Sequence, residues 1–345
     1  SDVAISSLKT GVSSVSVPEL GQIWFMGGRE RSGSYVFEVS TVEAYDIDNQ
    51  TWNEGPTLLE PQQYGAAAKI GDLIFIAGNW YPSSNPAQHS TGMLQIYNLS
   101  NETWYLGESM PSGLEVGNAG VTALDGYLWV AGGVKFPNGT DHSNRLLRYD
   151  PTLDNWSVMS SMNTSRWGLA LESFGGKLYS FGGANETGTN SWFIQGNPTY
   201  EVESYDPILD NWTVLQHMPK ATFGMASTIR YGEIMLIGGM AGGSSKQVYG
   251  FDPETEIWKK HGDLSFAAYD LTASELDGVM IAGTGDQTIY SYSAWGIYLS
   301  DIDRADNITL AQGHLTSRII DLRKNVNHTS RPYSIELVGV EPDGS

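Results

Sequence analysis

The side chains best suited to catalysis or metal binding are scattered in this sequence. The chain has no cysteine, which excludes disulfides, cysteine-based zinc sites, cysteine nucleophiles and thioether-linked cofactors. No two of the six histidines have metal-ligand spacing, and no run resembles an EF-hand calcium loop. No nucleophile elbow, phosphate-binding glycine loop or dinucleotide fingerprint precedes a helix-like pattern. We therefore expect no metal and no cofactor.

Asparagine carries a different chemical signal, because ten of the 18 Asn lie in Asn-x-Ser/Thr sequons. Such an excess favours a history in the secretory pathway, and hence an extracellular or cell-surface location. Several of these Asn also fall in a recurring turn, where Asn is favoured for local hydrogen bonding. The ten predicted N-glycosylation sites are Asn49, Asn98, Asn101, Asn138, Asn155, Asn163, Asn185, Asn211, Asn307 and Asn327.

Charge and composition limit the partners. The formal net charge of the 345 residues is −20, so we expect neither nucleic acid nor an anionic bilayer as a partner, and we find no basic patch in the sequence. No apolar run reaches the about 18 residues of a membrane span, and no signal-like segment opens the chain. The 40 glycines and 11 tryptophans favour many turns and short aromatic strands.

A repeat with a period near 50 residues organises the chain. An aromatic residue is followed seven positions later by Trp in five pairs: Tyr45/Trp52, Tyr97/Trp104, Tyr149/Trp156, Tyr205/Trp212 and Phe251/Trp258. Upstream of each pair, and once more near the end, an apolar run closes on glycine, at Gly27, Gly78, Gly132, Gly182, Gly238 and Gly283. In four runs a second glycine follows directly. We expect the repeated Trp to pack within and between the repeats.

This pattern resembles the Kelch repeat, in which an apolar strand closing on a Gly-Gly pair is followed by Tyr and then Trp. The resemblance implies an all-β fold, a six-bladed β-propeller with four antiparallel strands per blade, because one such sheet cannot bury both of its faces alone. We predict one domain over 1–345, with blades at 12–53, 62–105, 116–157, 166–213, 222–259 and 268–299. The sixth departs from the pattern, since Leu299 follows Tyr292 at the Trp position. The tail, 300–345, includes an apolar run at 334–340 that we expect to complete or cover the last blade.

The long loops all fall on one face. In antiparallel blades, the loops between the second and third strands emerge on the same face, and here they span 29–39, 79–93, 134–145 and 184–201. Four inner strands should begin after Tyr64-Gly65, Trp167-Gly168, Phe223-Gly224 and Tyr269-Asp270, and a fifth after Gly117-Asn118. We predict a ligand pocket at the channel mouth, where aromatic faces stack and polar groups direct hydrogen bonds. Its residues would be Gln63, Tyr64, Asn118, Arg166, Trp167, Phe223, Tyr269 and Asp270, with Trp80 and Trp192 from the loops. The alternative is that each aromatic packs between blades.

The preferred function is a non-catalytic extracellular binding module that recognises a glycan or protein ligand through the long-loop face. Copper radical oxidases of this superfamily need a tyrosine crosslinked to cysteine, which this chain lacks. Sialic acid mutarotases also resemble this fold and need no cofactor, so a sugar-converting enzyme using Glu115, Arg166 and Asp270 is one alternative. A Kelch protein-interaction adaptor is the other. Arg166 matches a position at which Kelch propellers often carry a partner-binding arginine.

Overall fold

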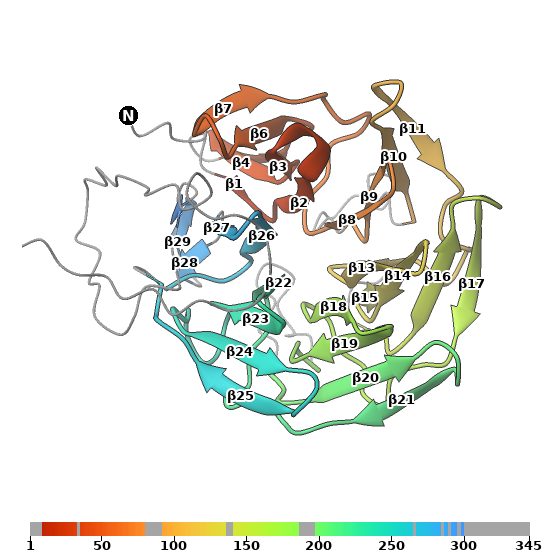
Figure 1. The fold of residues 1–345 in the computed structure, drawn as a ribbon, viewed down its shortest axis with the longest axis vertical. Helices are drawn as coiled ribbons and strands as arrows, with labels where there is room; N and C mark the ends of the chain where they lie inside the picture. The colour runs from red at the N-terminus through yellow and green to blue at the C-terminus, as the bar shows by residue number, and fades with distance from the viewer. Residues whose placement is uncertain are drawn as a thin grey trace, which may run out of the picture. The chain divides into compact units, whose positions relative to one another are not determined.

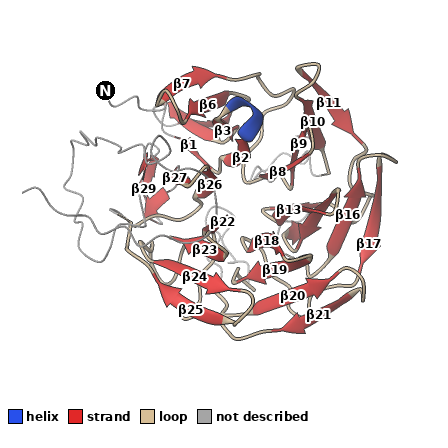
Figure 2. Cartoon of the chain, in the orientation of Figure 1, coloured by secondary structure: helices blue, strands red, loops and turns tan. Residues whose placement is uncertain are grey.

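The computed structural model describes residues 9–32, 35–79, 92–135, 141–185, 197–264, 267–283, 286–288, 291–294 and 298–299. All of them belong to one compact unit, Val3–Leu310. They form antiparallel β-structure with one short 3-10 helix, η1 (Pro18–Leu20) (Figure 2). None of the described residues forms a helix long and apolar enough to cross a membrane. The all-β fold is therefore confirmed.

Five four-stranded sheets follow the repeat, and we number them sheets 1 to 5 in chain order. Each is ordered from its first strand to its last, as the repeat predicts. Sheet 1 has β2 (Ser13–Val17), β3 (Gln22–Met26), β6 (Val42–Asp46) and β7 (Thr51–Glu54). Sheet 2 has β8 (Ala66–Ile70), β9 (Leu73–Ala77), β10 (Leu94–Asn98) and β11 (Thr103–Gly107). Sheet 3 has β13 (Gly120–Leu124), β14 (Tyr127–Ala131), β16 (Leu146–Asp150) and β17 (Asn155–Met159). Sheet 4 has β18 (Ala170–Phe174), β19 (Lys177–Phe181), β20 (Val202–Asp206) and β21 (Asn211–Val214). Sheet 5 has β22 (Ala226–Arg230), β23 (Glu233–Ile237), β24 (Val248–Asp252) and β25 (Ile257–Lys260).

A sixth sheet differs from the other five. Its described strands are β26 (Thr272–Leu276), β27 (Val279–Gly283) and β30 (Tyr298–Leu299). The sequence led us to expect Tyr292 in the third strand and Leu299 at the Trp position of the fourth. Instead Leu299 pairs with Ile281 as part of the third strand, while Tyr292 lies in a separate hairpin of β28 (Asp286–Thr288) and β29 (Ser291–Ala294). This strand assignment is therefore wrong, while the blade boundaries and the six complete blades stay predictions because 300–345 lie outside the described residues.

The first strands of the six sheets surround a common centre (Figure 1). Sheets 1 and 6 meet through hydroxyl groups: Ser14 Oγ lies 2.5 Å from Thr272 Oγ1 and 2.9 Å from Ser274 Oγ, and Ser16 Oγ donates to the Glu275 carbonyl at 2.6 Å. Apolar clusters join all six pairs of neighbouring sheets, and sheets 1 and 6 pack Ile23 and Phe25 against Leu276 and Ile281. Second strands such as β9 are buried on both faces, since each sheet lies between two neighbours. This burial explains their nearly continuous apolar sequences.

The repeated Tyr and Trp pack as expected. Tyr149 and Trp156 are cross-strand partners with ring centroids 5.1 Å apart, and Tyr205 and Trp212 repeat the contact at 5.2 Å. The indole also ties neighbouring sheets, because its Nε1 donates to a carbonyl of the preceding sheet's segment. These bonds join Trp104 to Pro56 (2.9 Å), Trp156 to Glu108 (2.7 Å) and Trp212 to Ser160 (2.8 Å).

The glycine pairs lie at contacts between sheets. A Cβ on Gly182 would stand 2.3 Å from the Thr222 carbonyl oxygen of the segment leading to sheet 5. The adjacent Gly183 donates its N–H to that same oxygen at 2.9 Å. The equivalent approach recurs at Gly27, Gly132 and Gly238. Glycine is therefore required here because the backbones of successive sheets come too close for a side chain.

Candidate binding face

Six equivalent residues form the rim of the ring's centre on the long-loop face. Each stands two positions before an inner strand and has left-handed backbone angles, with φ between 50 and 65°. Backbone bonds tie neighbours: Tyr64 N–H donates to the Gly11 carbonyl at 2.9 Å, Gly224 to Gly168 at 2.8 Å and Asp270 to Gly224 at 2.7 Å. Gly168 donates to Asn118 at 2.9 Å, and Asn118 donates to Gly78 at 2.8 Å. We call this set the rim: Gly11, Tyr64, Asn118, Gly168, Gly224 and Asp270.

The rim surrounds a central channel with a cavity volume of about 350 Å³. All six rim residues and all six first strands line it. Each first strand pairs with its second strand along one edge, so its other edge turns toward the channel. Unpaired N–H and C=O groups on these edges make the wall polar even where the side chains are alanine or glycine.

Three predicted site residues line the channel, namely Tyr64, Asn118 and Asp270. They are the three rim members that carry side chains. The Tyr64 ring is half-buried, and the guanidinium of Arg29 stands 5.2 Å from its centroid. Asn118 and Asp270 are also half-buried. The described part of the predicted pocket therefore offers one aromatic surface, one amide and one carboxylate. Their role in binding stays a prediction.

The other aromatic residues of the expected ring do not line the channel. Trp167 and Phe223 are 2% and 5% exposed, and their rings pack edge to face with centroids 5.1 Å apart. They form a cluster with Val134, Ala184 and Met240, which Tyr64 and the half-buried Tyr269 adjoin. Trp167, Phe223 and Tyr269 each stand one residue before the rim, whereas Tyr64 stands in the rim itself. The expectation that aromatic side chains at equivalent repeat positions surround the channel mouth is therefore wrong. The packing alternative holds for Trp167 and Phe223.

Gln63 occupies the same position in the segment before sheet 2 and is also buried, with 1% of its surface exposed. Its backbone N–H donates to Asn79 Oδ1 at 3.0 Å, and its Nε2 donates to Glu38 Oε1 at 3.1 Å. These bonds connect two loops of the rim face. We had expected Gln63 in the pocket wall, and its burial makes it a support for the loops instead.

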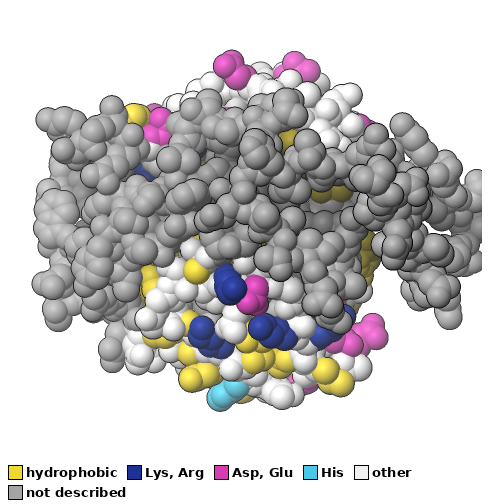
Figure 3. Space-filling view, turned by 90° about the vertical axis from the view of Figure 1, so that its left-hand side faces the viewer, with side chains coloured by type: hydrophobic (Ala, Val, Ile, Leu, Met, Phe, Trp, Pro, Cys, Tyr) yellow, Lys and Arg dark blue, Asp and Glu magenta, His cyan; other side chains and the backbone are white. Residues whose placement is uncertain are grey.

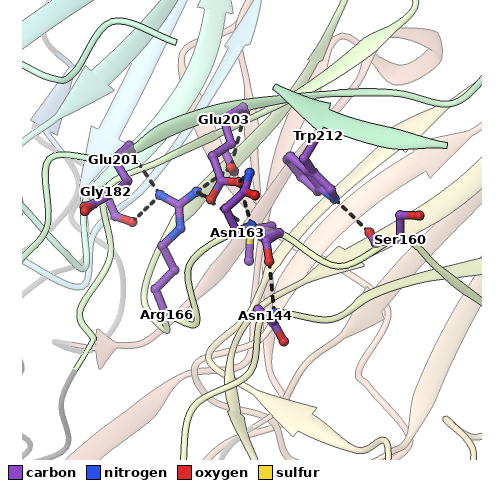
Figure 4. A network of polar contacts seen from close by, with 10 residues as sticks. Asn144, Ser160, Asn163, Arg166, Gly182, Glu201, Glu203 and Trp212 are labelled. Carbon is purple, nitrogen blue, oxygen red and sulfur yellow. Dashed lines mark hydrogen bonds and ion pairs between the residues drawn. The ribbon is translucent and has the colours of Figure 1, made fainter. Parts of the chain in front are cut away.

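Arg166 is fully buried and bound within sheet 4 (Figure 4). Its Nη2 donates to Glu203 Oε1 at 2.9 Å and to Ser180 Oγ at 2.8 Å, and its Nη1 donates to the carbonyls of Gly182 and Glu201, each at 2.9 Å. Burial lowers the pKa of Arg166, and the adjacent Glu203 opposes that effect. The expected partner-binding role is therefore wrong for this arrangement, because the guanidinium makes its bonds inside the sheet.

The repeat explains why Arg166 is structural. Lys9 stands four residues before the first strand of sheet 1, as Arg166 does before β18, and its ammonium forms an ion pair with Glu43 at 3.1 Å. In sheet 2 the equivalent pair is Gln62 with Gln95, joined at 3.0 Å. Each pair ties the segment before the first strand to the third strand of the same sheet. Arg166 and Glu203 are the sheet 4 version of this link.

The structure does not bring the proposed acid/base residues together. Of Glu115, Arg166 and Asp270, Asp270 alone lines the channel. The Glu115 Oε2 accepts the Gly113 N–H at 2.6 Å in an exposed turn. Among the described residues, no three His, Asp or Glu side chains are grouped to hold a metal ion. Trp80 and Trp192 lie outside the described residues.

Sequence reasoning missed Glu172, which lies in the channel wall on β18. Ser227 Oγ of β22 donates to its Oε1 at 2.7 Å. Burial raises the pKa of Glu172 to about 7, and the hydrogen bond from Ser227 opposes the rise. Aligning the first strands would have shown this residue, because the third positions of the other five are Val15, Ala68, Thr122, Thr228 and Ser274.

The surface is less uniformly acidic than the composition suggests. In Figure 3, Lys and Arg side chains gather in the lower part of the described surface. In sheet 5, Lys246 and Lys260 both pair with Asp263, at 3.5 and 3.4 Å, and all three side chains are substantially exposed to solvent. The two lysines share one carboxylate and do not form a basic patch, and exposed pairs of this kind contribute little to stability.

Comparisons with known proteins agree on one kind of repeat. The family model of the Kelch motif matches residues 116–163 and 168–219. Kelch-like protein 15 of Homo sapiens is 27% identical over 278 residues, covering 75% of this chain and 43% of that protein. Kelch-like protein 36 of Bos taurus is 31% identical over 183 residues, covering 51% of this chain and 28% of that protein. The chain thus matches less than half the length of these relatives. A solved structure described as "Structure of YjhT" shares the fold, with a TM-score of 0.56, 20% identity, and coverage of 66% of this chain and 74% of that one.

Proposed function

Because the chain belongs to the Kelch-repeat family and folds as an all-β propeller, we propose that it is a non-catalytic protein-interaction module that binds its partner at the rim face. Kelch repeats and the similarity to Kelch-like proteins support an interaction role. The site on the propeller is argued from this chain's own residues, since a shared fold does not fix a function.

The observation that carries the proposal is the hydrogen-bonded rim. Backbone bonds between successive sheets hold Tyr64, Asn118 and Asp270 at fixed positions around one opening. A rigid set of aromatic and polar side chains loses little conformational entropy on binding, which favours affinity. The long loops emerge around the same opening and enlarge the surface that a protein partner can contact.

We favour a protein over a glycan as the ligand, because sugars are held by several stacked aromatic faces together with directed hydrogen bonds. Among the described residues of the expected ring, Tyr64 alone lines the channel, while Trp167 and Phe223 are buried. Glycan recognition remains the second candidate. A glycan array tests it: binding that Tyr64→Ala abolishes supports the glycan proposal, and an array without signal counts against it.

The partner experiment compares opposite faces of the propeller. The protein is expressed in its native host and crosslinked to its partners, which are identified and mapped by mass spectrometry. We expect crosslinks at the rim face and loss of the main partner in the double variant Tyr64→Ala/Asp270→Ala. Tyr231→Ala is the matched control, since Tyr231 is 75% exposed in the turn between β22 and β23, on the other face. Equal loss in both variants, or crosslinks confined to the turns of the other face, contradicts the proposal.

We also propose an extracellular or cell-surface location. Four sequon asparagines, Asn49, Asn101, Asn155 and Asn211, are exposed at the hairpins between third and fourth strands. Exposure is what a glycan needs, so these positions support the proposal. Removing N-glycans enzymatically from protein made in its native host should lower its mass. Unmodified asparagine at all four positions would contradict the proposed location.

A further inference from the structure

The channel has a polar wall whose backbone groups require hydrogen-bond partners from inside the channel. The free edges of six first strands supply N–H and C=O groups that hydrogen-bond to water or to a ligand. A cavity of about 350 Å³ has room for a small molecule together with water.

Glu172 is the unusual group in this wall. The equivalent residues of the other five first strands are uncharged, so a carboxylate is not required for the fold at this position. Between sheets 6 and 1, the equivalent contact joins two hydroxyls, Ser274 and Ser14. Between sheets 4 and 5, Ser227 donates one hydrogen bond to Glu172 Oε1. Among the described residues, no other hydrogen bond or ion pair reaches this carboxylate.

The other charged side chains in the channel wall do not neutralise Glu172. The Lys69 ammonium donates to Glu19 Oε1 and to the Gly71 carbonyl, both at 2.6 Å. Glu275 Oε1 accepts the Gly278 N–H at 2.5 Å, and Asp270 belongs to the rim. With Tyr64, these are the titratable groups that line the channel beside Glu172. Among the described residues, the wall thus has three carboxylates and one cation, and that cation already bonds to Glu19 and Gly71.

We propose that the channel binds a small organic cation with a primary ammonium group, and that Glu172 is its counter-ion. An ammonium has three N–H donors and no acceptor. One donor would reach the Glu172 carboxylate, and the other two would find backbone carbonyls on the free strand edges. This site lies below the rim and is separate from the proposed protein-binding face.

The test is calorimetric titration of the protein with n-butylammonium chloride at about pH 8, with n-butanol as the neutral probe of the same chain length. We expect the ammonium and not the alcohol to bind, and Glu172→Gln to weaken binding by at least about ten-fold. The glutamine keeps an oxygen that accepts from Ser227. Glu275→Gln is the matched control, because it also removes one carboxylate from the channel wall, and it should leave the affinity within about two-fold.

The wild-type protein provides a second readout that needs no variant. Because the pKa of Glu172 is raised to about 7 while an alkylammonium stays charged, affinity should fall by about thirty-fold from about pH 8 to about pH 5.5. Binding that is absent, that is equally strong for n-butanol, that is lost equally in both variants, or that does not change with pH overturns the proposal.

Discussion

Arg166 and Glu203 form an ion pair of 2.9 Å in which neither side chain has any exposed surface. The pair connects the segment before β18 to β20, and Glu203 Oε2 also accepts the backbone N–H and the Nδ2 of Asn163, each at 2.7 Å. A buried charge that loses its partner is strongly destabilising, whereas an apolar pair of similar volume is often tolerated. Sheet 3 has such an apolar pair at the equivalent positions, Val116 and Leu147, both buried.

This comparison predicts a non-additive pair of substitutions. Arg166→Val and Glu203→Leu should each lower the free energy of unfolding by about 3–5 kcal/mol, because each leaves one buried charge unpaired. The double variant, which copies the residues of sheet 3, should lose less than either single variant. Urea denaturation of the three proteins measures this. Additive losses would show that the two side chains act independently.

Two glycines of sheet 4 should differ clearly in their tolerance of alanine. Gly182 and Gly176 both have positive φ, of 53° and 78°. Gly182→Ala brings a methyl group against the Thr222 carbonyl, whereas Gly176 has no neighbour within 4 Å. Gly176→Ala should therefore cost only the about 1–2 kcal/mol of a left-handed residue, and Gly182→Ala should cost clearly more. Thermal unfolding checks the order, and equal costs would remove the steric explanation of the motif.

The hydrogen bonds of the repeated Trp indoles predict a difference in stability between two further variants. Trp212 Nε1 donates to Ser160, but the buried Trp258 Nε1 has no acceptor among the described residues. Trp212→Phe should thus lower the free energy of unfolding by about 1 kcal/mol more than Trp258→Phe. Both variants keep an aromatic ring against the third strand. A larger loss for Trp258→Phe would contradict the role of the indole N–H.

Glu172 predicts how stability depends on pH. Its folded-state pKa is about 7, above the ordinary glutamate value of 4.5, so the folded state holds this proton more tightly than the unfolded chain. The stabilisation from that proton is complete below the unfolded pKa and is lost as the pH rises through about 7. Glu172→Gln should therefore be more stable than wild type at about pH 8, by up to about 3 kcal/mol, with the difference vanishing toward about pH 4.5.

The control for this effect is Glu254→Gln, which removes one charge from an exposed turn of the same acidic protein. Its melting temperature should follow that of wild type across the same pH range. If both variants gain stability equally, the cause is the overall negative charge, and the account of Glu172 is wrong.

The repeat made most of the fold predictable, because glycine, Tyr and Trp mark its second, third and fourth strands, respectively. The first strands carry no comparable marker, and this is where the site prediction failed. Trp167, Phe223 and Tyr269 follow the preceding Trp by 11 residues, but Tyr64 follows Trp52 by 12. That single-residue difference places Tyr64 in the rim and the other rings in the cluster beside it.

Burial of polar groups was harder to predict. The sequence alone suggests that Arg166 is exposed, because its partner Glu203 lies 37 residues further along the chain, in β20. The sixth sheet was misread for the opposite reason, since Tyr292 matches the motif locally but pairs within a hairpin. Only tertiary contacts distinguish these cases.

Hydrogen–deuterium exchange on the complex with the native partner tests the rim-face proposal most directly. We expect slower exchange on binding in the segments that carry the rim, at 9–11, 62–64, 116–118, 166–168, 222–224 and 268–270. Slower exchange confined to the turns of the other face, at 206–210 and 231–232, with unchanged exchange at the rim, would contradict it.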